Sequence, residues 1–310
     1  MAYKSLSLGL VWPFLFCGFQ GGLATRSLLG ELEAKYASDG LMIAGVMNRN
    51  VMVFPFSGDP FVRSFFGYDL EAAWTTTDGT AVLGYSYFGG VSLPARRLVL
   101  IDVNGRVAGV LDREVINVGG MALAADNRAI AFTGKDPLTG ETGLFLGRLG
   151  SGEIHLVIPL QSREGVPEET SVAWLPGAGG IAFSRDKQIW TYDLASRRTS
   201  LLFRGTNPSY SPDGQWIAYR GLNGYAVIAS RQGYSEKRMS RGRVYGHIHW
   251  SPDSEYLFVD EKVHGVPSQR CPFGYCFVVY RVGDGSRLEL QGTDRQDSPF
   301  GWLRAPGLVR

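Results

Sequence analysis

Two histidines, His247 and His249, have the residue type and spacing that best suit acid–base chemistry in this chain. They flank Ile248 in a segment that reads as a strand, and alternation along a strand places both side chains on one face. An imidazole can act as a general base near neutral pH, so the pair is the candidate catalytic site. The alternative is a pair of hydrogen-bonded core residues. Zinc would need further ligands. His264 and Asp260 are candidate ligands only by their proximity in the sequence, and no ligand spacing supports a site, so we predict no metal and no cofactor.

The known catalytic motifs are missing from the sequence. There is no Gly-x-Ser-x-Gly elbow, no His-Glu-x-x-His helix, no phosphate-binding loop and no dinucleotide fingerprint. An enzyme in this chain would have to work with scattered polar residues.

A basic run near residue 240 is the second candidate site. Its members, opposed only by Glu236, are Arg231, Lys237, Arg238, Arg241 and Arg243. Such a run can meet an anionic glycan, a phosphate or an acidic protein surface, whereas the alternative is a solvated outer strand and loop. The whole chain has 31 basic and 29 acidic residues and a net charge of +2, so we predict no nucleic-acid partner.

Two of the three cysteines, Cys271 and Cys276, lie in one short loop, and Cys17 lies far away near the N-terminus. In an exported protein such a pair predicts a disulfide. Phe273 and Tyr275 stand between the two cysteines. A rigid projecting loop would lower the entropy cost of binding, so they are candidate partner contacts. The alternative is that both rings pack over the neighbouring strands.

A repeat supplies the elements that must position these residues. It is clearest at Tyr210–Tyr219 and Trp250–Val259, where Ser-Pro-Asp separates two apolar segments. Looser copies centre on Leu123, Trp174 and Trp74, and a half-copy ends the series at Phe300–Leu303. Proline fixes φ and glycine accepts a positive φ, so the shared motif predicts a tight turn between two strands. The turn aspartates should accept backbone N–H bonds; they are Asp78, Asp126, Asp213 and Asp253.

Each unit continues with a third apolar strand and a more polar fourth strand. Four strands with the most polar one outermost form a propeller blade, and the copies recur about every 46 residues. The last strand, Pro299–Leu303, lacks a successor, and the first, near Leu41–Ala44, lacks a predecessor. We therefore predict an all-β, six-bladed β-propeller over residues 40–304, with four-stranded blades and a ring closed by the C-terminal strand.

The repeat Ser-Pro-Asp-Gly-x-x-Ile-Ala-Tyr resembles the PD40-type, WD40-like repeat of the TolB-like family of six-bladed propellers. The resemblance covers about residues 40–303 at the level of the repeat pattern. It implies a propeller scaffold. TolB itself carries an α/β domain before its propeller, for which residues 25–40 leave no room, so no TolB partner is carried over.

The N-terminal residues 1–24 read as a signal peptide. Lys4 precedes the apolar stretch Leu6–Phe19, and Gly22 and Ala24 are small residues that place cleavage after Ala24. The alternatives are a buried N-terminal helix or an uncleaved anchor. Residues 25–39 are predicted to form a short amphipathic helix or linker, with apolar residues at Leu28, Leu29, Leu32 and Tyr36. Residues 305–310 form a tail.

These patterns favour an exported, periplasmic or secreted, non-catalytic propeller that binds a protein or glycan partner. After signal cleavage we predict no stable membrane span. The alternative is a lyase or hydrolase with its site at the central channel. A channel pocket that combines a histidine, an arginine and a carboxylate would favour the enzyme, and a flat aromatic or basic surface would favour binding.

Overall fold

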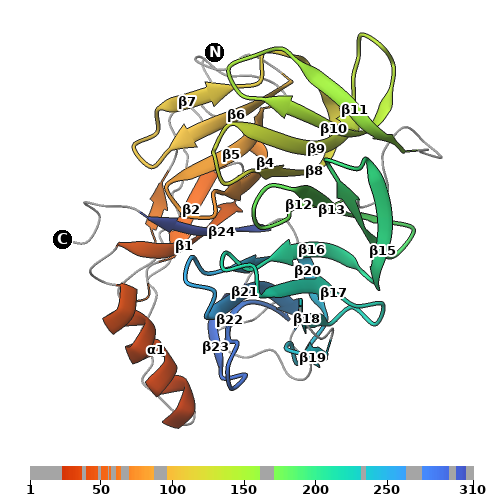
Figure 1. Ribbon diagram of the computed structural model, residues 1–310. Coiled ribbons are helices and arrows are strands. Elements are labelled where there is room, and N and C mark those ends of the chain that lie inside the picture. The colour runs from red at the N-terminus through yellow and green to blue at the C-terminus, as the bar shows by residue number, and fades with distance from the viewer. Residues whose placement is uncertain are drawn as a thin grey trace, which may run out of the picture.

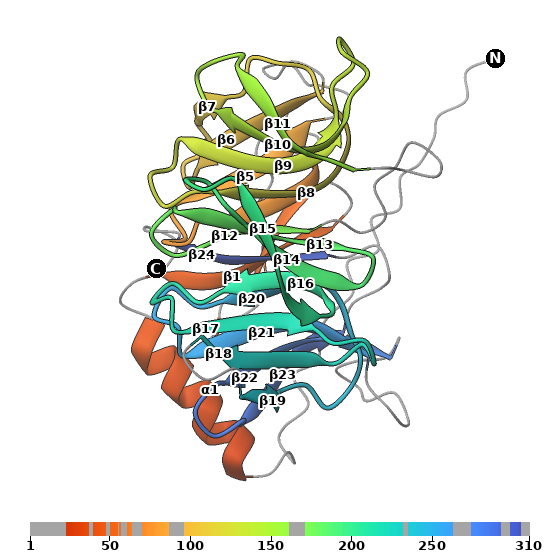
Figure 2. The ribbon, with the colours of Figure 1, turned by 45° about the vertical axis from the view of Figure 1, so that its right-hand side comes forward.

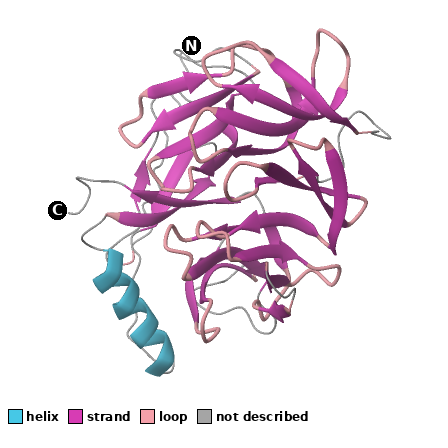
Figure 3. Cartoon of the chain, viewed as in Figure 1, coloured by secondary structure: helices cyan, strands magenta, loops and turns pink. Residues whose placement is uncertain are grey.

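The strands of this chain are arranged in four-stranded antiparallel sheets around a common centre (Figure 1). The computed structural model describes residues 23–36, 40–47, 50–54, 56, 61–63, 70–86, 96–160, 171–231, 235–262, 274–292 and 298–304. Within these ranges there are six such sheets and one helix at the rim (Figure 3). The expectation of an all-β propeller with four-stranded blades is confirmed.

One sheet joins the two ends of the chain, and the other sheets are simple meanders. The joined sheet has the order β24 (Ser298–Arg304), β1 (Leu41–Met47), β2 (Asn50–Phe54), β3 (Phe61–Arg63). The next two sheets are β4 (Leu70–Thr75), β5 (Ala81–Ser86), β6 (Arg97–Asp102), β7 (Val107–Val110), and β8 (Ile116–Leu123), β9 (Ala129–Lys135), β10 (Thr142–Arg148), β11 (Ile154–Pro159). The fourth is β12 (Val172–Trp174), β13 (Gly180–Arg185), β14 (Gln188–Asp193), β15 (Arg198–Arg204). The last two are β16 (Thr206–Tyr210), β17 (Trp216–Arg220), β18 (Ala226–Ser230), β19 (Glu236–Arg238), and β20 (Val244–Trp250), β21 (Tyr256–Lys262), β22 (Tyr275–Arg281), β23 (Arg287–Gly292).

The predicted repeat turn links the first and second strands of these meanders. In the β16–β17 turn, Asp213 Oδ1 accepts the N–H of Gln215 at 3.0 Å and the hydroxyl of Ser211 at 2.6 Å. The Ser211 hydroxyl in turn accepts the N–H of Trp216 at 2.9 Å. The same role falls to Asp78, Asp126 and Asp253, which accept N–H bonds of 2.8 to 3.1 Å from the residues that follow them. The predicted turn chemistry of the four aspartates is confirmed.

Burial of the second and third strands between neighbouring sheets builds the core. Along β13, Ile181 and Phe183 pack with Leu144 of β10, whereas Ala182 packs with Ile217 of β17. Alternate residues of one strand therefore contact the sheets on either side, which explains why these strands are apolar throughout. The outermost strand β19 is exposed along its whole length.

In two of the sheets, a tryptophan at the end of the innermost strand bonds to the preceding sheet. The indole N–H of Trp174 donates to the carbonyl of Ala122 at 2.9 Å, and that of Trp250 donates to the carbonyl of Ser209 at 3.0 Å. Each acceptor lies one residue before the end of the neighbouring innermost strand. The aromatic anchors of the repeat thus set the spacing of the strands around the centre.

The C-terminal strand β24 contacts its partner strand within the sheet and the innermost strands of two other sheets. It pairs with β1, with Ile43 opposite Trp302, and it lies against both β4 and β20. Gly301 makes this approach possible: its φ is +133°, and a Cβ there would lie 2.0 Å from Thr75 Oγ1 of β4. The backbone N–H of Arg304 also donates to the carbonyl of Gly79 at 2.7 Å.

The single helix of the described chain, α1 (Leu23–Tyr36), packs against the β20–β23 sheet (Figure 2). Leu28, Leu32 and Tyr36 are buried in one cluster with aromatic rings of that sheet. The Tyr36 hydroxyl donates to Asp253 Oδ2 at 2.6 Å, and Lys35 Nζ lies 2.7 Å from the same atom. The apolar residues at helical spacing therefore form the face of α1 that packs against the propeller.

We expect Gly301→Ala to destabilise the protein, because the new methyl group would overlap Thr75 and hold alanine at a strained φ. The loss should be about 1–3 kcal/mol, which lowers the melting temperature by roughly 2–4 °C per kcal/mol. Thermal unfolding followed by circular dichroism measures it. Gly283→Ala is the matched control, since a Cβ at Gly283 meets nothing within 4 Å. Equal melting temperatures for both variants would contradict the close β24–β4 approach.

Candidate functional site

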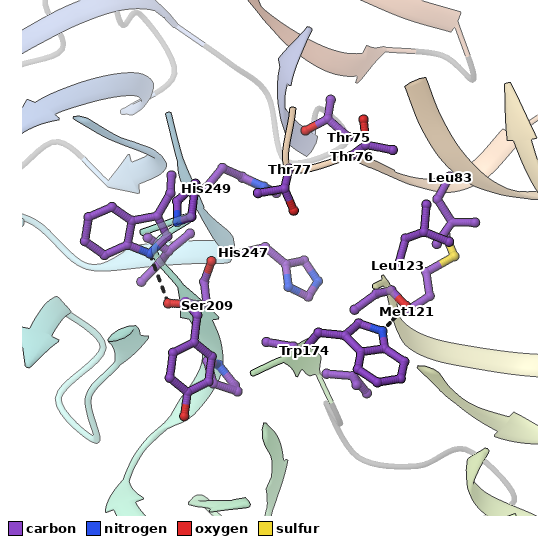
Figure 4. A pocket seen from close by; sticks show the side chains of 18 residues that line it. Thr75, Thr76, Thr77, Leu83, Met121, Leu123, Trp174, Ser209, His247 and His249 are labelled. Carbon is purple, nitrogen blue, oxygen red and sulfur yellow. Dashed lines mark hydrogen bonds between the residues drawn. The ribbon is translucent and has the colours of Figure 1, made fainter. Parts of the chain in front are cut away.

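A cavity of about 150 Å³ lies where the innermost strands β4, β8, β12, β16 and β20 end (Figure 4). It is built from the last residues of these strands and the turns that follow them. Threonines, aromatic rings, aliphatic side chains and two histidines share the wall. The residues are Thr75, Thr76, Thr77, Leu83, Met121, Ala122, Leu123, Val172, Ala173, Trp174, Pro208, Ser209, Tyr210, Pro212, His247, Ile248, His249 and Trp250.

The two histidines singled out in the sequence both line this channel cavity. Their ring centroids are 6.3 Å apart. His249 is buried and lies 6.3 Å from the ring of Phe258, whereas His247 is half-buried and points into the open centre (Figure 4). A register shift in β20 between Tyr245 and His249 brings Ile248 to the wall as well.

Burial, aided by the positive charge of Arg220, lowers the pKa of His247 to about 4 from its ordinary value of 6.5. The imidazole is therefore neutral at physiological pH. A neutral ring presents one N–H donor and one acceptor nitrogen, so it can hydrogen-bond a ligand. It is a weak base for proton abstraction, because an effective general base has a pKa near the working pH.

No charged side chain lines the described part of the channel cavity. Several of its polar groups already serve the fold: the Trp174 and Trp250 indoles bond neighbouring strands, and the Thr76 hydroxyl donates to Asp78 Oδ1 at 2.6 Å. The exposed Thr77 and the half-buried His247 add hydrogen-bonding capacity at the opening. The arrangement suits an uncharged, partly apolar segment of a ligand.

The residues of the basic run lie in different elements and do not form one patch. Lys237 donates to the carbonyl of Val282 at 3.3 Å, and the Arg238 guanidinium lies 3.5 Å from the Tyr225 ring centroid. Both residues belong to β19, and Arg231 lies in the preceding turn. Arg241 is exposed on the linker to β20. Arg243 lines a second cavity, which lies at the other end of β20.

The position of Tyr275 fits the alternative in which its ring packs over the neighbouring strands. Tyr275 is the first residue of β22, is buried, and packs edge-on against Tyr245 with ring centroids 5.2 Å apart. Pairing of β22 with β21, where Tyr275 lies opposite Lys262, draws the ring into the sheet. Cys276 is fully buried in the same strand. Cys271 and Phe273 lie outside the described residues, as do Cys17 and residues 1–22.

The two residues weighed as additional zinc ligands for the histidine pair cannot both be located. Asp260 is buried in β21, and His264 lies outside the described residues. Across the portions of chain that the structure describes, no group of three or more His, Cys, Asp or Glu residues could hold a metal ion. In the same portions, no helix is long and apolar enough to cross a membrane.

Most residues of the channel cavity wall could not be predicted as site residues from the sequence. Thr77, Met121 and Pro208 come from separate sheets, and each is an ordinary turn or strand residue in the sequence. The one available signal was position: residues that end an innermost strand, such as Trp174 and Trp250, face the centre of a propeller. The repeat shows where each innermost strand ends, but it does not show that these ends together line a cavity.

Comparison with known proteins adds a fold-level likeness. The sequence matches no protein-family profile and no curated protein. The structure is similar to TolB from Acinetobacter baumannii, with a TM-score of 0.63 and 14% identity over 89% of this chain and 71% of that one. It is also similar to a putative TolB from Agrobacterium tumefaciens, with a TM-score of 0.56 and 18% identity over 86% of this chain and 98% of that one. The chain is a β-propeller that resembles TolB in fold.

We expect the His247 imidazole to stay neutral until the pH falls well below 6. The unfolded chain binds the proton near pH 6.5 and the folded chain only near pH 4, so the free energy of unfolding falls as the pH drops through this window. NMR titration of the imidazole measures the pKa, and denaturant unfolding across the window measures the stability. His247→Gln should remove this part of the pH dependence. A titration midpoint near 6.5 would contradict the burial.

Proposed function

We propose that this protein is a non-catalytic propeller scaffold that binds a protein or glycan partner at the channel cavity. The observation that carries the proposal is the composition of the wall: hydrogen-bonding and apolar side chains from five neighbouring innermost strands, with no charged group among the described residues. Such a mixed surface favours recognition, because a few polar groups orient a ligand while apolar groups supply most of the buried area.

The rival lyase or hydrolase is not supported by the same cavity. Proton abstraction would require a base with a pKa near the working pH and, for charge development, a cation or carboxylate nearby. His247 has a pKa of about 4, and neither arginine nor carboxylate lines the described wall. The likeness to TolB structures supports a propeller scaffold.

We also propose that the six sheets form one closed ring completed by β24. Support comes from the pairing of β24 with β1 and from its contacts with both β4 and β20. The innermost strands of the other sheets continue the series, since β20 contacts β16, β16 contacts β12 and β12 contacts β8. Closure would leave only the short outermost strands of the sheets as edges.

Binding at the channel cavity is tested by affinity capture with a matched pair of variants. Thr77→Glu places a charge in the uncharged cavity, and Leu138→Glu places the same charge on an exposed residue of the β9–β10 turn. We expect immobilised wild-type protein and Leu138→Glu to retain the same protein or glycan from a cell-envelope extract. Thr77→Glu should lose it by tenfold or more, about 1.4 kcal/mol. Equal retention by both variants would rule out the channel cavity as the binding site.

Export and a Cys271–Cys276 disulfide are further parts of the proposal. A mature chain that starts at Thr25 would still keep Leu28, Leu32 and Tyr36, the buried face of α1. Intact mass spectrometry of protein from its native host should show this start and a mass lighter by two hydrogens than that of the reduced form. A chain that begins at Met1, or one with free thiols, would contradict the corresponding part.

A further inference from the structure

A second cavity, of about 280 Å³, lies at the opposite ends of β16 and β20 from the channel cavity. Its wall includes Thr206 and Val244, the first residues of these two strands, whereas the channel cavity contains their last residues, Tyr210 and Trp250. The two cavities are therefore separate and are built at different ends of the same strands.

Three basic side chains line this basic cavity, and they come from three neighbouring sheets. Lys187 lies in the β13–β14 turn, Arg220 ends β17, and Arg243 immediately precedes β20. No carboxylate is part of the wall where the structure describes it. Three like charges around one hollow repel each other in water, and the field they produce attracts an anion.

Backbone hydrogen bonds fix the positions from which these side chains extend. The carbonyl of Lys187 accepts the N–H of Gly205 at 2.9 Å. Arg220 pairs with Thr206 across β16 and β17, and its Nε donates to the Thr206 hydroxyl at 3.1 Å. The carbonyl of Arg243 accepts the N–H of Lys262 at 2.7 Å. The cavity is thus held in shape by the sheets before any ligand arrives.

Lys187 occupies a tight turn whose backbone conformation suits glycine better than lysine. Asp186 and Lys187 form the two-residue link between β13 and β14, with φ values of 53° and 58°. Glycine or asparagine suits such left-handed positions, and a lysine there is strained. The turn conformation alone would favour glycine at position 187, so the ammonium group gives a reason for the lysine.

Gly224 shapes the other side of the basic cavity. It has a φ of +85°, and a Cβ there would lie 3.2 Å from Cγ of Arg243. Its carbonyl accepts the N–H of Val244 at 2.8 Å. The absence of a side chain lets the aliphatic stem of Arg243 lie against the β17–β18 turn. This contact restricts the arginine, which reduces the entropy lost when a ligand is bound.

We propose that the basic cavity binds a small organic anion that carries phosphate or carboxylate groups. Arginine guanidinium groups match both groups in bidentate geometry, and lysine adds a point charge. Leu222 and Tyr245 on the wall are 62% and 38% exposed, so they offer apolar surface to the organic part of the ligand. The volume accommodates a small molecule or one end group of a larger one.

Isothermal titration calorimetry with inorganic phosphate, pyrophosphate and citrate at low salt tests the proposal. We expect wild-type protein to bind at least one of the three, and the strongest of them identifies phosphate or carboxylate as the preferred group. Lys187→Gly and Arg243→Gln should each weaken binding about tenfold. Lys187→Gly should also leave the melting temperature unchanged or higher, because it relieves the strained turn.

Two control variants make the result decisive. Arg231→Gln removes an exposed cation outside the basic cavity, and Thr77→Glu alters only the channel cavity. Neither should weaken anion binding, so failure here is distinguishable from failure of the partner-binding proposal. The proposal is overturned if none of the three anions binds, if Lys187→Gly and Arg243→Gln bind as wild type, or if Arg231→Gln weakens binding equally.

Discussion

Hydrogen bonds from a tryptophan indole at the end of one innermost strand to a carbonyl of the preceding innermost strand fix two of the junctions between sheets at the centre of this propeller. Trp174 makes one with Ala122, and Trp250 makes one with Ser209. Because donor and acceptor lie on different sheets, each bond fixes how close two sheets come and how they are offset. The residues of both bonds line the channel cavity, so the way these sheets are joined shapes part of its wall.

The same strands present different chemistry at their two ends. At the ends of β16 and β20 near Tyr210 and Trp250, the wall of the cavity is neutral and partly apolar. At their beginnings, Arg220 and Arg243 surround a basic hollow together with Lys187. Arg220 also contributes to the low pKa of His247, so the charge at one end helps to keep the other end neutral. One scaffold can in this way offer two recognition surfaces without a change of fold.

The N-terminal helix shows how an element outside the repeat is tied to it. The Tyr256 hydroxyl donates to Glu31 Oε1 at 2.6 Å, and Arg281 forms an ion pair with the same carboxylate. Lys35 and Tyr36 reach Asp253, an aspartate of the repeat turn. Asp253 therefore accepts hydrogen bonds both from its own turn and from α1. These bonds lower the pKa of its carboxyl group and so favour the ionised form.

The sequence alone determined the architecture, because the repeat encodes local physics. Ser211, Asp213 and Gly214 specify a turn through side-chain acceptors and a positive φ, and apolar segments on either side specify buried strands. Tertiary structure decided which residues share a cavity. Lys187, Arg220 and Arg243 are 56 positions apart at most in the sequence and carry no common motif, yet three sheets bring them to one hollow. The choice between an exposed and a packed Tyr275 also needed the structure, since its burial follows from the pairing of β22 with β21. Local sequence sets backbone conformation, whereas a site depends on the distance between separate strands, which only their packing fixes.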